Sequence, residues 1–303
     1  MLDASRAARI EALGYDYERR PKESVGACNL CAGRRLAEVS RSDRYGYPAV
    51  LMICARCGLG FLSPRLTAAE YAAFYDGVYR PLVSAYHGRL IDAETVQGEQ
   101  HDYAEGLADH LGRVLATPPR SIMDIGGSTG AVAAPLCERF GAEATVIDPA
   151  PDELRVAREA GMETIAGLAE SYDPEGRTWD LVLLCQTIDH LLDVAGTLDA
   201  IRGMMAADGR AFVDVLDVSF MMRRRGSVEK AVKIDHPFYL TRLTALGHFS
   251  RAGLAVESER LSDDGHWGFV LSPGDAADPD WPALRAGADR LLSEAWALRA
   301  GDA

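Results

Sequence analysis

The 303-residue chain is 48% hydrophobic and 25% charged, a composition typical of folded globular proteins rather than disordered or fibrous ones. Its formal net charge of −13 argues against a general nucleic-acid binder, because such proteins gain affinity by neutralising phosphates with lysine and arginine. No apolar run reaches the roughly 18 residues that a membrane span needs. Residues 1–20 also lack the apolar core of a signal peptide, so we expect a cytoplasmic protein that does not act on membranes.

Four of the six cysteines form two C-x2-C pairs, Cys28 with Cys31 and Cys54 with Cys57. Four thiolates on two short turns can surround Zn²⁺ tetrahedrally, and Gly58 suits a tight turn after the second pair. Because the protein would fill all four ligand positions, the pattern predicts a structural zinc site. The alternative is four unligated thiols.

The middle of the chain divides at a proline pair. Aromatic residues recur at helical spacing between about residues 67 and 115, which predicts helices there. The Thr-Pro-Pro of residues 117–119 cannot continue a helix. We therefore predict an N-terminal zinc-binding module over residues 1–80, a helical connector over 81–118 and a larger domain over 119–303.

Short apolar runs alternate with helical segments in this larger domain, which is the pattern of a doubly wound α/β fold with a parallel sheet. Pro135 lies inside the first helix, so this helix should be kinked or begin late. An irregular substrate-side insertion is predicted at about 217–240, then a helix over Leu240–Ala252, and a surface helix from Asp280. The expected strands are Ser121–Ile125, Ala144–Ile147, Glu163–Ile165, Leu181–Cys185, Ala211–Leu216, Leu254–Leu261 and Trp267–Leu271.

A glycine-rich loop follows the first strand and leads into a helix; it contains Asp124, Gly126, Gly127, Ser128 and Gly130. Small residues let the backbone approach a ligand closely, and the helix N-terminus offers free N–H groups. Asp148 ends the next strand, where a carboxylate can hold both hydroxyls of a ribose. The spacing does not match the G-x-G-x-x-G dinucleotide fingerprint. The alternative is a tight turn that binds no ligand.

The loop resembles motif I of class I methyltransferases that use S-adenosylmethionine (SAM), an acidic residue followed by G-x-G-x-G, with Ser128 at the middle glycine. The resemblance extends over roughly residues 119–273. It implies a Rossmann-like methyltransferase core, SAM as cofactor and Asp148 on its ribose. It also places Leu168, after the third strand, near the adenine, and Gln186 just beyond the fourth strand.

The N-terminal part is similar to one subgroup, C-methyltransferases that act on nucleotide-linked ketosugars and carry an N-terminal zinc domain. The similarity rests on the run from Cys54 to Arg65 and on the aromatic residues from Tyr71 to Tyr79. It implies an active-site role for Tyr79, whose alternative is aromatic packing against the core. That subgroup has a further C-terminal Rossmann-like domain, which the 303 residues do not include.

Methyl transfer from a sulfonium needs a positioned acceptor and, where required, a base that takes its proton. His190 follows the fourth strand, at the sheet edge where α/β proteins hold ligands; the alternative is an exposed histidine at a helix start. Asp235 and His236 are adjacent in the insertion, where the ketosugar subgroup has a catalytic acidic residue followed by histidine. We expect His236 to be the base, oriented by Asp235 and aided by His190, with its pKa raised by the carboxylate. The alternative is a solvated histidine near a helix N-cap.

Basic residues gather in the same insertion of this acidic chain: Arg223, Arg224, Arg225, Lys230 and Lys233. They are candidates for binding a substrate phosphate, and the alternative is a solvated face.

The sequence therefore predicts a SAM-dependent methyltransferase for a small molecule, a sugar or nucleotide-sugar that can carry phosphate. Two other functions remain open. One is an RNA methyltransferase whose zinc module grips nucleic acid, which the acidic balance disfavours. The other is a non-catalytic SAM-binding protein whose zinc module recruits a partner.

Overall fold

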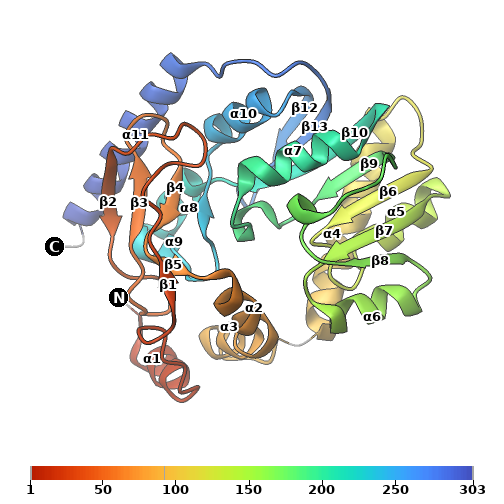
Figure 1. Cartoon of the computed structure of the whole chain (residues 1–303). Coiled ribbons are helices and arrows are strands. Elements are labelled where there is room, and N and C mark those ends of the chain that lie inside the picture. The colour runs from red at the N-terminus through yellow and green to blue at the C-terminus, as the bar shows by residue number, and fades with distance from the viewer. Residues whose placement is uncertain (1, 92, 302–303) are drawn as a thin grey trace.

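The computed structural model describes residues 2–91 and 93–301 and is built around one seven-stranded sheet (Figure 1). The spatial order of its strands is β12-β13-β10-β9-β6-β7-β8. All seven predicted strands are present; β10, β9, β6, β7 and β8 are parallel, whereas β13 runs antiparallel to both β10 and β12. The strands are β6 (Ser121–Ile125), β7 (Glu143–Asp148), β8 (Glu163–Ala166), β9 (Trp179–Leu184), β10 (Met205–Leu216), β12 (Leu254–Leu261) and β13 (His266–Pro273).

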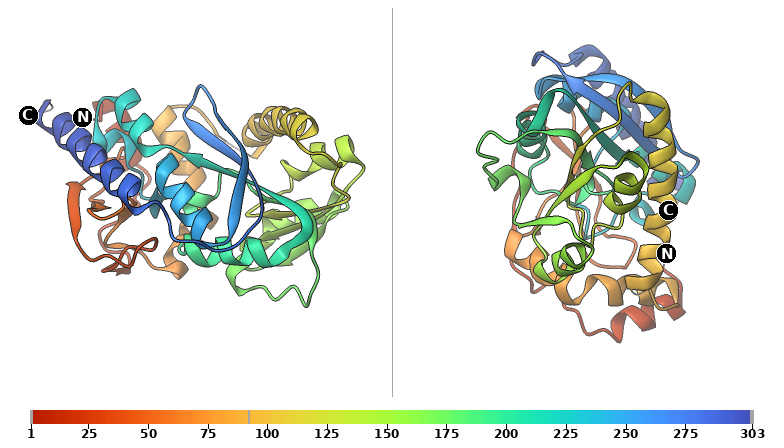
Figure 2. Two further views of the ribbon diagram at one scale, coloured as in Figure 1. Left: turned by 90° about the horizontal axis from the view of Figure 1, so that it is seen from above. Right: turned by 90° about the vertical axis from the view of Figure 1, so that its right-hand side faces the viewer.

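Helices cover both faces of this sheet, as Figure 2 shows from two further directions. They are α4 (Ala93–Val114), α5 (Ala133–Phe140), α6 (Pro151–Glu159), α7 (Val194–Met204) and α10 (Arg242–Arg251). Successive side chains of a strand point to opposite faces. On β9, Leu181 and Leu183 accordingly join the core shared with α4 and α5. Val182 and Leu184 join the core shared with α7 and α10. The predicted Rossmann-like core is therefore confirmed, with an antiparallel edge.

The first helix of the core begins late, as predicted from its proline. Val132 is the N-cap of α5 and Pro135 is the third helical residue. The first four N–H groups of a helix have no partner within it, so a proline there costs no helical hydrogen bond.

A second, four-stranded sheet lies beside the large one and contains β2 (Leu36–Ser40), β3 (Leu51–Cys54), β4 (Gly60–Leu62) and β11 (Phe238–Tyr239). Its strand β11 comes from a distant part of the chain, and pairs Phe238 with Phe61 and Tyr239 with Gly60. The segment just before β11 is thereby attached to the N-terminal sheet. The other N-terminal elements are α1 (Ala4–Glu11), β1 (Lys22–Glu23), β5 (Arg65–Leu66), α2 (Ala68–Gly77) and α3 (Tyr79–His87).

The segment predicted to be irregular at 217–240 contains two helices, α8 (Val218–Arg225) and α9 (Val228–Ala231), so that prediction was wrong. The Asp217 side chain caps α8 by accepting a hydrogen bond from the Phe220 N–H at 3.0 Å. Gly226 ends α8 in the left-handed region, with φ of 63°. These two caps are strong local signals that the apolar pattern alone does not reveal.

The helix predicted from Asp280 is α11 (Trp281–Gly301), and it packs against the N-terminal sheet and α8. A Cβ on Gly58 would lie 3.2 Å from the Ala288 backbone, so this glycine lets α11 approach closely. No helix within residues 2–91 and 93–301 is both long and apolar enough to span a membrane.

Candidate functional site

The glycine-rich loop after β6 has a backbone that only small residues can adopt. Gly126 and Gly130 have φ of 68° and 75°, in the left-handed region, and Ser128 has φ of 53°. A Cβ on Gly126 would lie 2.5 Å from Thr187, and one on Gly130 would lie 2.5 Å from Met162. Neighbouring side chains therefore close both positions to larger residues.

Two carboxylates flank this loop. Asp148, at the end of β7, accepts hydrogen bonds from the N–H groups of Ser128 at 3.1 Å and Ala150 at 2.8 Å. Asp124, at the end of β6, is buried, and its Oδ2 finds no hydrogen-bond donor among the described residues. Burial, followed by the nearby charge of Asp148, raises the pKa of Asp124 to about 7. A buried, unpaired carboxyl oxygen beside a glycine loop is an arrangement that a cationic ligand group would complete.

The next two predicted positions also lie along this edge of the sheet. Leu168 is 41% exposed, just before the short helix η1 (Ala169–Ser171), so its side chain is free to contact a ligand. Gln186 follows β9 with φ of 51°. Its N–H donates to Asp214 at 2.5 Å, and Asp214 also accepts from the Tyr103 hydroxyl at 2.7 Å. Sequence reasoning missed Asp214 and Tyr103, because their pairing joins residues 111 apart.

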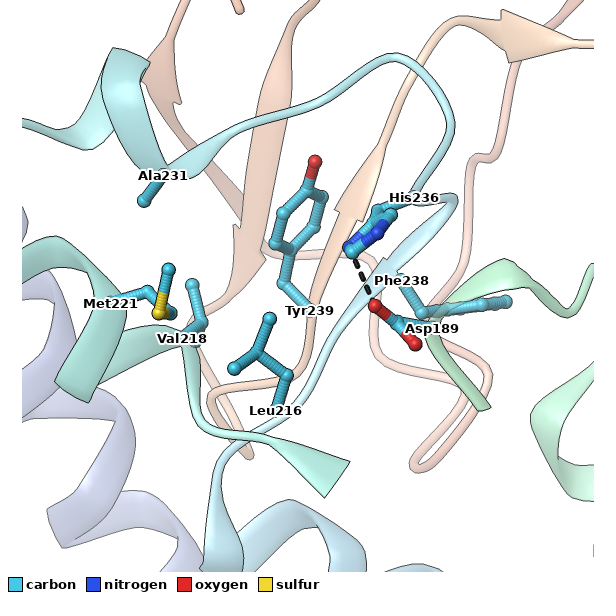
Figure 3. Close-up of a pocket in the computed structure, with 8 residues that line it drawn as sticks. All are labelled: Asp189, Leu216, Val218, Met221, Ala231, His236, Phe238 and Tyr239. Atoms are coloured by element: carbon cyan, nitrogen blue, oxygen red, sulfur yellow. Dashed lines mark ion pairs between the residues drawn. The ribbon is translucent and has the colours of Figure 1, made fainter. Parts of the chain in front are cut away.

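His236 pairs with Asp189, as Figure 3 shows. It lies farther from its neighbour Asp235. The His236 Nδ1 atom lies 2.6 Å from Asp189 Oδ2, whereas Nε2 lies 3.5 Å from Asp235 Oδ2 and has no hydrogen-bond partner in the described part of the chain. Asp189 lies in the short helix η2 (Ile188–His190), directly after β9. Sequence reasoning named His190 in this segment and overlooked Asp189.

The charge states of this pair follow from burial. Burial lowers the pKa of His236 to about 4 and outweighs the opposing attraction of Asp189. Our expectation of a raised pKa was therefore wrong. Burial alone would raise the pKa of Asp189, but the attraction of His236, His190 and Lys233 brings it below its ordinary range. At neutral pH, Asp189 is ionised and accepts from His236 Nδ1–H, which leaves a lone pair on Nε2.

Asp235 is fully buried beside this pair, and neither of its carboxyl oxygens accepts a hydrogen bond from the residues described. Lys233 Nζ lies 3.4 Å from Asp235 Oδ2. Burial opposes ionisation, yet the charges of Lys233, His236 and His190 together lower the pKa of Asp235 below its usual value. An ionised carboxylate that is paired with Lys233 but accepts no hydrogen bond therefore faces the free nitrogen of His236, where it would stabilise an imidazolium.

His190 and two tyrosines form one wall of this cluster. The His190 and His236 rings lie 4.6 Å apart between centroids, and the donor atoms of Asp189, His190 and His236 all lie within 4.8 Å of one another. His190 Nδ1 lies 2.6 Å from the hydroxyl of Tyr75, which was not predicted. Tyr79 packs edge-on against Tyr75, with 5.4 Å between the ring centroids, and is partly exposed. Both alternatives for Tyr79, aromatic packing and a role in the active site, fit this position.

Residues of the second sheet, of the loop after β2 and of α2 hold the His236 segment by its backbone. Asp43, buried in the loop after β2, accepts from the Ile234 N–H at 3.1 Å. Leu62 N–H donates to the Pro237 carbonyl at 3.0 Å. The Tyr71 hydroxyl donates to the Ile234 carbonyl at 3.1 Å. The segment that carries His236 is thus held by N-terminal residues more than 150 positions away in sequence.

The four paired cysteines converge on one buried point. The Sγ atoms of Cys28, Cys31, Cys54 and Cys57 all lie within 4.8 Å of one another. The two turns are alike: Ala32 N–H donates to the Cys28 carbonyl and Gly58 N–H to the Cys54 carbonyl, each at 2.8 Å. Both donors have positive φ, 53° for Ala32 and 84° for Gly58. The predicted set of four ligands is therefore assembled as one possible metal site.

The predicted basic group is divided rather than gathered. Arg223 pairs with Glu294 at 3.1 Å, and Arg224 contacts the Asp263 carbonyl at 3.5 Å. Lys233 points to Asp235, as described above. Arg225 is the last residue of α8 and is exposed.

Comparison with known proteins identifies this architecture. A family described as a methyltransferase domain matches residues 99–259. The chain belongs to that family. It is an enzyme of the SAM-dependent methyltransferase type.

Two curated relatives of this methyltransferase are ubiquinone biosynthesis O-methyltransferases. The protein from Methylocella silvestris is 35% identical over 104 residues, 32% of this chain and 40% of the relative. The protein from Xylella fastidiosa is 25% identical over 155 residues, 49% of this chain and 58% of the relative. The chain thus matches about half the length of these relatives.

Two solved structures show the same fold. The mitomycin 7-O-methyltransferase has 18% identity and a TM-score of 0.51, covering 67% of this chain and 60% of its own. A protein from Pyrococcus horikoshii has 19% identity and a TM-score of 0.50, covering 58% of this chain and 91% of its own.

We expect Asp148→Ala to weaken binding of adenosylhomocysteine by about 1–3 kcal/mol, the range for losing hydrogen bonds to a charged group. Isothermal titration calorimetry measures this directly. Asp152→Ala, at an exposed position in the first turn of α6, removes the same charge nearby and should leave affinity unchanged. Equal affinities for wild type and Asp148→Ala would remove Asp148 from the cofactor site.

Proposed function

We propose that this methyltransferase transfers a methyl group to a hydroxyl of a small molecule, a sugar or nucleotide-sugar, with His236 as the base. The observation that carries the proposal is the buried Asp189–His236 pair, whose free Nε2 faces away from Asp189. The O-methyltransferase names of the relatives support an oxygen acceptor.

The chain's residues fit a bound SAM. The glycine loop allows close backbone approach; Asp148 would hold the ribose hydroxyls, Leu168 would contact the adenine, and the unpaired Oδ2 of Asp124 would accept from the amino group. When bound, SAM supplies an electrophilic methyl group on a sulfonium. The fixed backbone of the loop therefore has a positioning role in the reaction.

His236 would take the acceptor proton at Nε2 as the acceptor oxygen becomes nucleophilic. Asp189 holds the Nδ1 proton, which keeps the lone pair on Nε2 and stabilises the positive ring that forms. The unsatisfied oxygens of Asp235 would accept hydrogen bonds from further hydroxyls, which suits a polyol such as a sugar. The cavity beside His236 has a volume of about 10 Å³, room for one water rather than for a sugar. We therefore expect the acceptor to approach from the side of His190, whose ring centroid lies 4.6 Å from that of His236 and which is partly exposed.

We also propose that the four cysteines hold one structural Zn²⁺. Four thiols fill a tetrahedral site, so no position remains for water or substrate. The metal would then organise the N-terminal module, residues 1–80, and take no part in the chemistry.

We expect Asp189→Asn to lower kcat roughly tenfold to a hundredfold, less than losing the base itself, because the neutral amide holds the imidazole more weakly. Adenosylhomocysteine release with a panel of sugars, nucleotide-sugars and phenols measures turnover. Asp199→Asn, at an exposed position on α7, is the matched control. Turnover with phenols but not with sugars or nucleotide-sugars would contradict the proposed sugar acceptor. An unchanged kcat in Asp189→Asn would show that the Asp189–His236 pair has no role in catalysis.

A further inference from the structure

Positive charges converge on Tyr86 in this otherwise acidic chain. The guanidinium carbons of Arg44 and Arg6 lie 4.2 Å and 4.9 Å from the centroid of the Tyr86 ring. Arg44 comes from the loop after β2 and Arg6 from α1, which packs against α3 (Figure 1). Two guanidinium groups on one aromatic ring are already ordered for binding.

Two more basic groups complete this arrangement. His87 follows Tyr86 at the end of α3, and Arg225 ends α8. Burial first, and then the charges of Arg44, Arg89, Arg6 and Arg225, lower the pKa of His87. The Arg44 N–H donates to the Val232 carbonyl at 2.9 Å, in the segment that follows α8, so the part of the chain that carries Arg225 is attached to the loop of Arg44. We call Arg6, Arg44, His87 and Arg225 the Tyr86 basic cluster.

Carboxylates do not balance this charge. Within the described ranges, neither Arg44 nor Arg225 has a carboxylate oxygen within 4.0 Å. The Nε atom of Arg44 is buried without a hydrogen-bond partner in those same ranges. Arg6 has one ion pair, with Asp3 at 3.4 Å, and both side chains are about half exposed, where such a pair stabilises little. Gathering like charges without acids costs free energy that a bound anion would offset.

Arg44 also connects the cluster to the candidate active site. Burial, then Asp235 and Asp189, raises the pKa of Tyr79, while Arg44 opposes this rise. Tyr45, next to Arg44 in the chain, packs edge-on against Tyr86 at 5.3 Å. Arg44 thus lies beside Tyr86, and its charge also acts on Tyr79.

We propose that the Tyr86 basic cluster is a binding site for a phosphate-type anion. Planar guanidinium groups offer paired N–H donors that match phosphate oxygens. The anion is either a phosphate group of the methyl acceptor or a separate anionic ligand. Only the first source rests on the proposed function, and the two share the same chemistry at the cluster.

The test is calorimetric titration of the full chain with inorganic phosphate and with pyrophosphate at low ionic strength, since salt screens exposed charges. We expect Arg44→Gln and Arg225→Gln each to weaken binding about tenfold or more, as for loss of a charge-assisted hydrogen bond. Arg44→Lys should recover part of the affinity because it keeps the charge. Arg223→Gln removes the same charge from the same helix, where Glu294 already pairs it, and should change nothing.

No measurable binding, or equal affinities in wild type and in both cluster variants, would overturn the proposal. Because these titrations need no turnover, they succeed or fail independently of the methyl-transfer assignment. Competition separates the two sources. If phosphate raises the KM for a phosphorylated acceptor, and Arg44→Gln raises that KM without changing kcat, the anion belongs to the acceptor. If phosphate binds without competing, it is a separate ligand of the same site.

Discussion

His236→Ala should lower kcat about 10²–10⁴-fold, the usual contribution of a general base, and leave adenosylhomocysteine affinity nearly unchanged. The reason is geometric. Nε2 of His236 is the unpartnered nitrogen of a buried imidazole whose other nitrogen lies 2.6 Å from Asp189. Turnover by stopped assay and binding by calorimetry separate the two effects.

The pH dependence of the wild-type rate tests the role of His236 independently. Burial, aided by the charges of Lys233 and His190 and opposed by Asp189, lowers the pKa of His236 to about 4, so the imidazole is neutral around pH 7. Its base form is lost only as pH falls through that value. The wild-type rate should therefore be level from about pH 6 to 8, rather than rise near the ordinary pKa of about 6.5. A rise centred near 6.5 would contradict this environment for His236.

Two variants guard against a folding defect. His236→Gln keeps a hydrogen-bond donor for Asp189, so it should fold and still lose the base. His248→Gln is the matched control: His248 is equally buried, its pKa is lowered to about 3 by burial, and it lies on α10 outside the cluster. If His190→Ala alone abolishes turnover while His236→Gln does not, the base lies on η2.

The core was predictable because its signals are local. Each parallel strand is a short apolar run between helical segments, and the glycine loop and Asp148 lie at strand ends that meet along one edge. Helices α8 and α9 were missed because a capping aspartate and a closing glycine define α8, while its side chains show no clear apolar stripe. Local sequence patterns therefore predict the strands of the large sheet but not the helices of the insertion at 217–240.

The site was only half predictable, for a related reason. His190, Asp235 and His236 stand out as chemistry-bearing residues at the expected edge. The partner of His236, Asp189, is 47 positions away and is chosen by the packing of η2 against β11. The buried Asp43 that holds Ile234 is 191 positions away. No rule of sequence spacing predicts these pairs, because the residues come together only when the two sheets pack against each other.

The docking of the two sheets should also depend on the proposed zinc site. Cys54→Ser should destabilise the protein by about 4 kcal/mol or more, because binding energy at a structural zinc is folding energy. For a chain of this size the midpoint of thermal unfolding should fall by about 10 °C. Elemental analysis of wild type should show one zinc per chain, and its absence in protein prepared without chelators would remove the metal site.

The same substitution should abolish turnover although none of the four paired cysteines lies beside His236. Cys54 ends β3, and the turn to Cys57 leads into β4, whose Phe61 pairs with Phe238 just beyond His236. Loss of the proposed zinc would free this hairpin and with it His236, the proposed base, whereas the glycine loop and Asp148 lie on the other sheet and should keep their geometry. Cys54→Ser should therefore still bind adenosylhomocysteine. Cys137→Ser, a half-buried cysteine on α5, makes the same chemical change and should retain both binding and turnover. A metal-free protein that still turns over at the wild-type rate would show that the second sheet positions His236 without zinc.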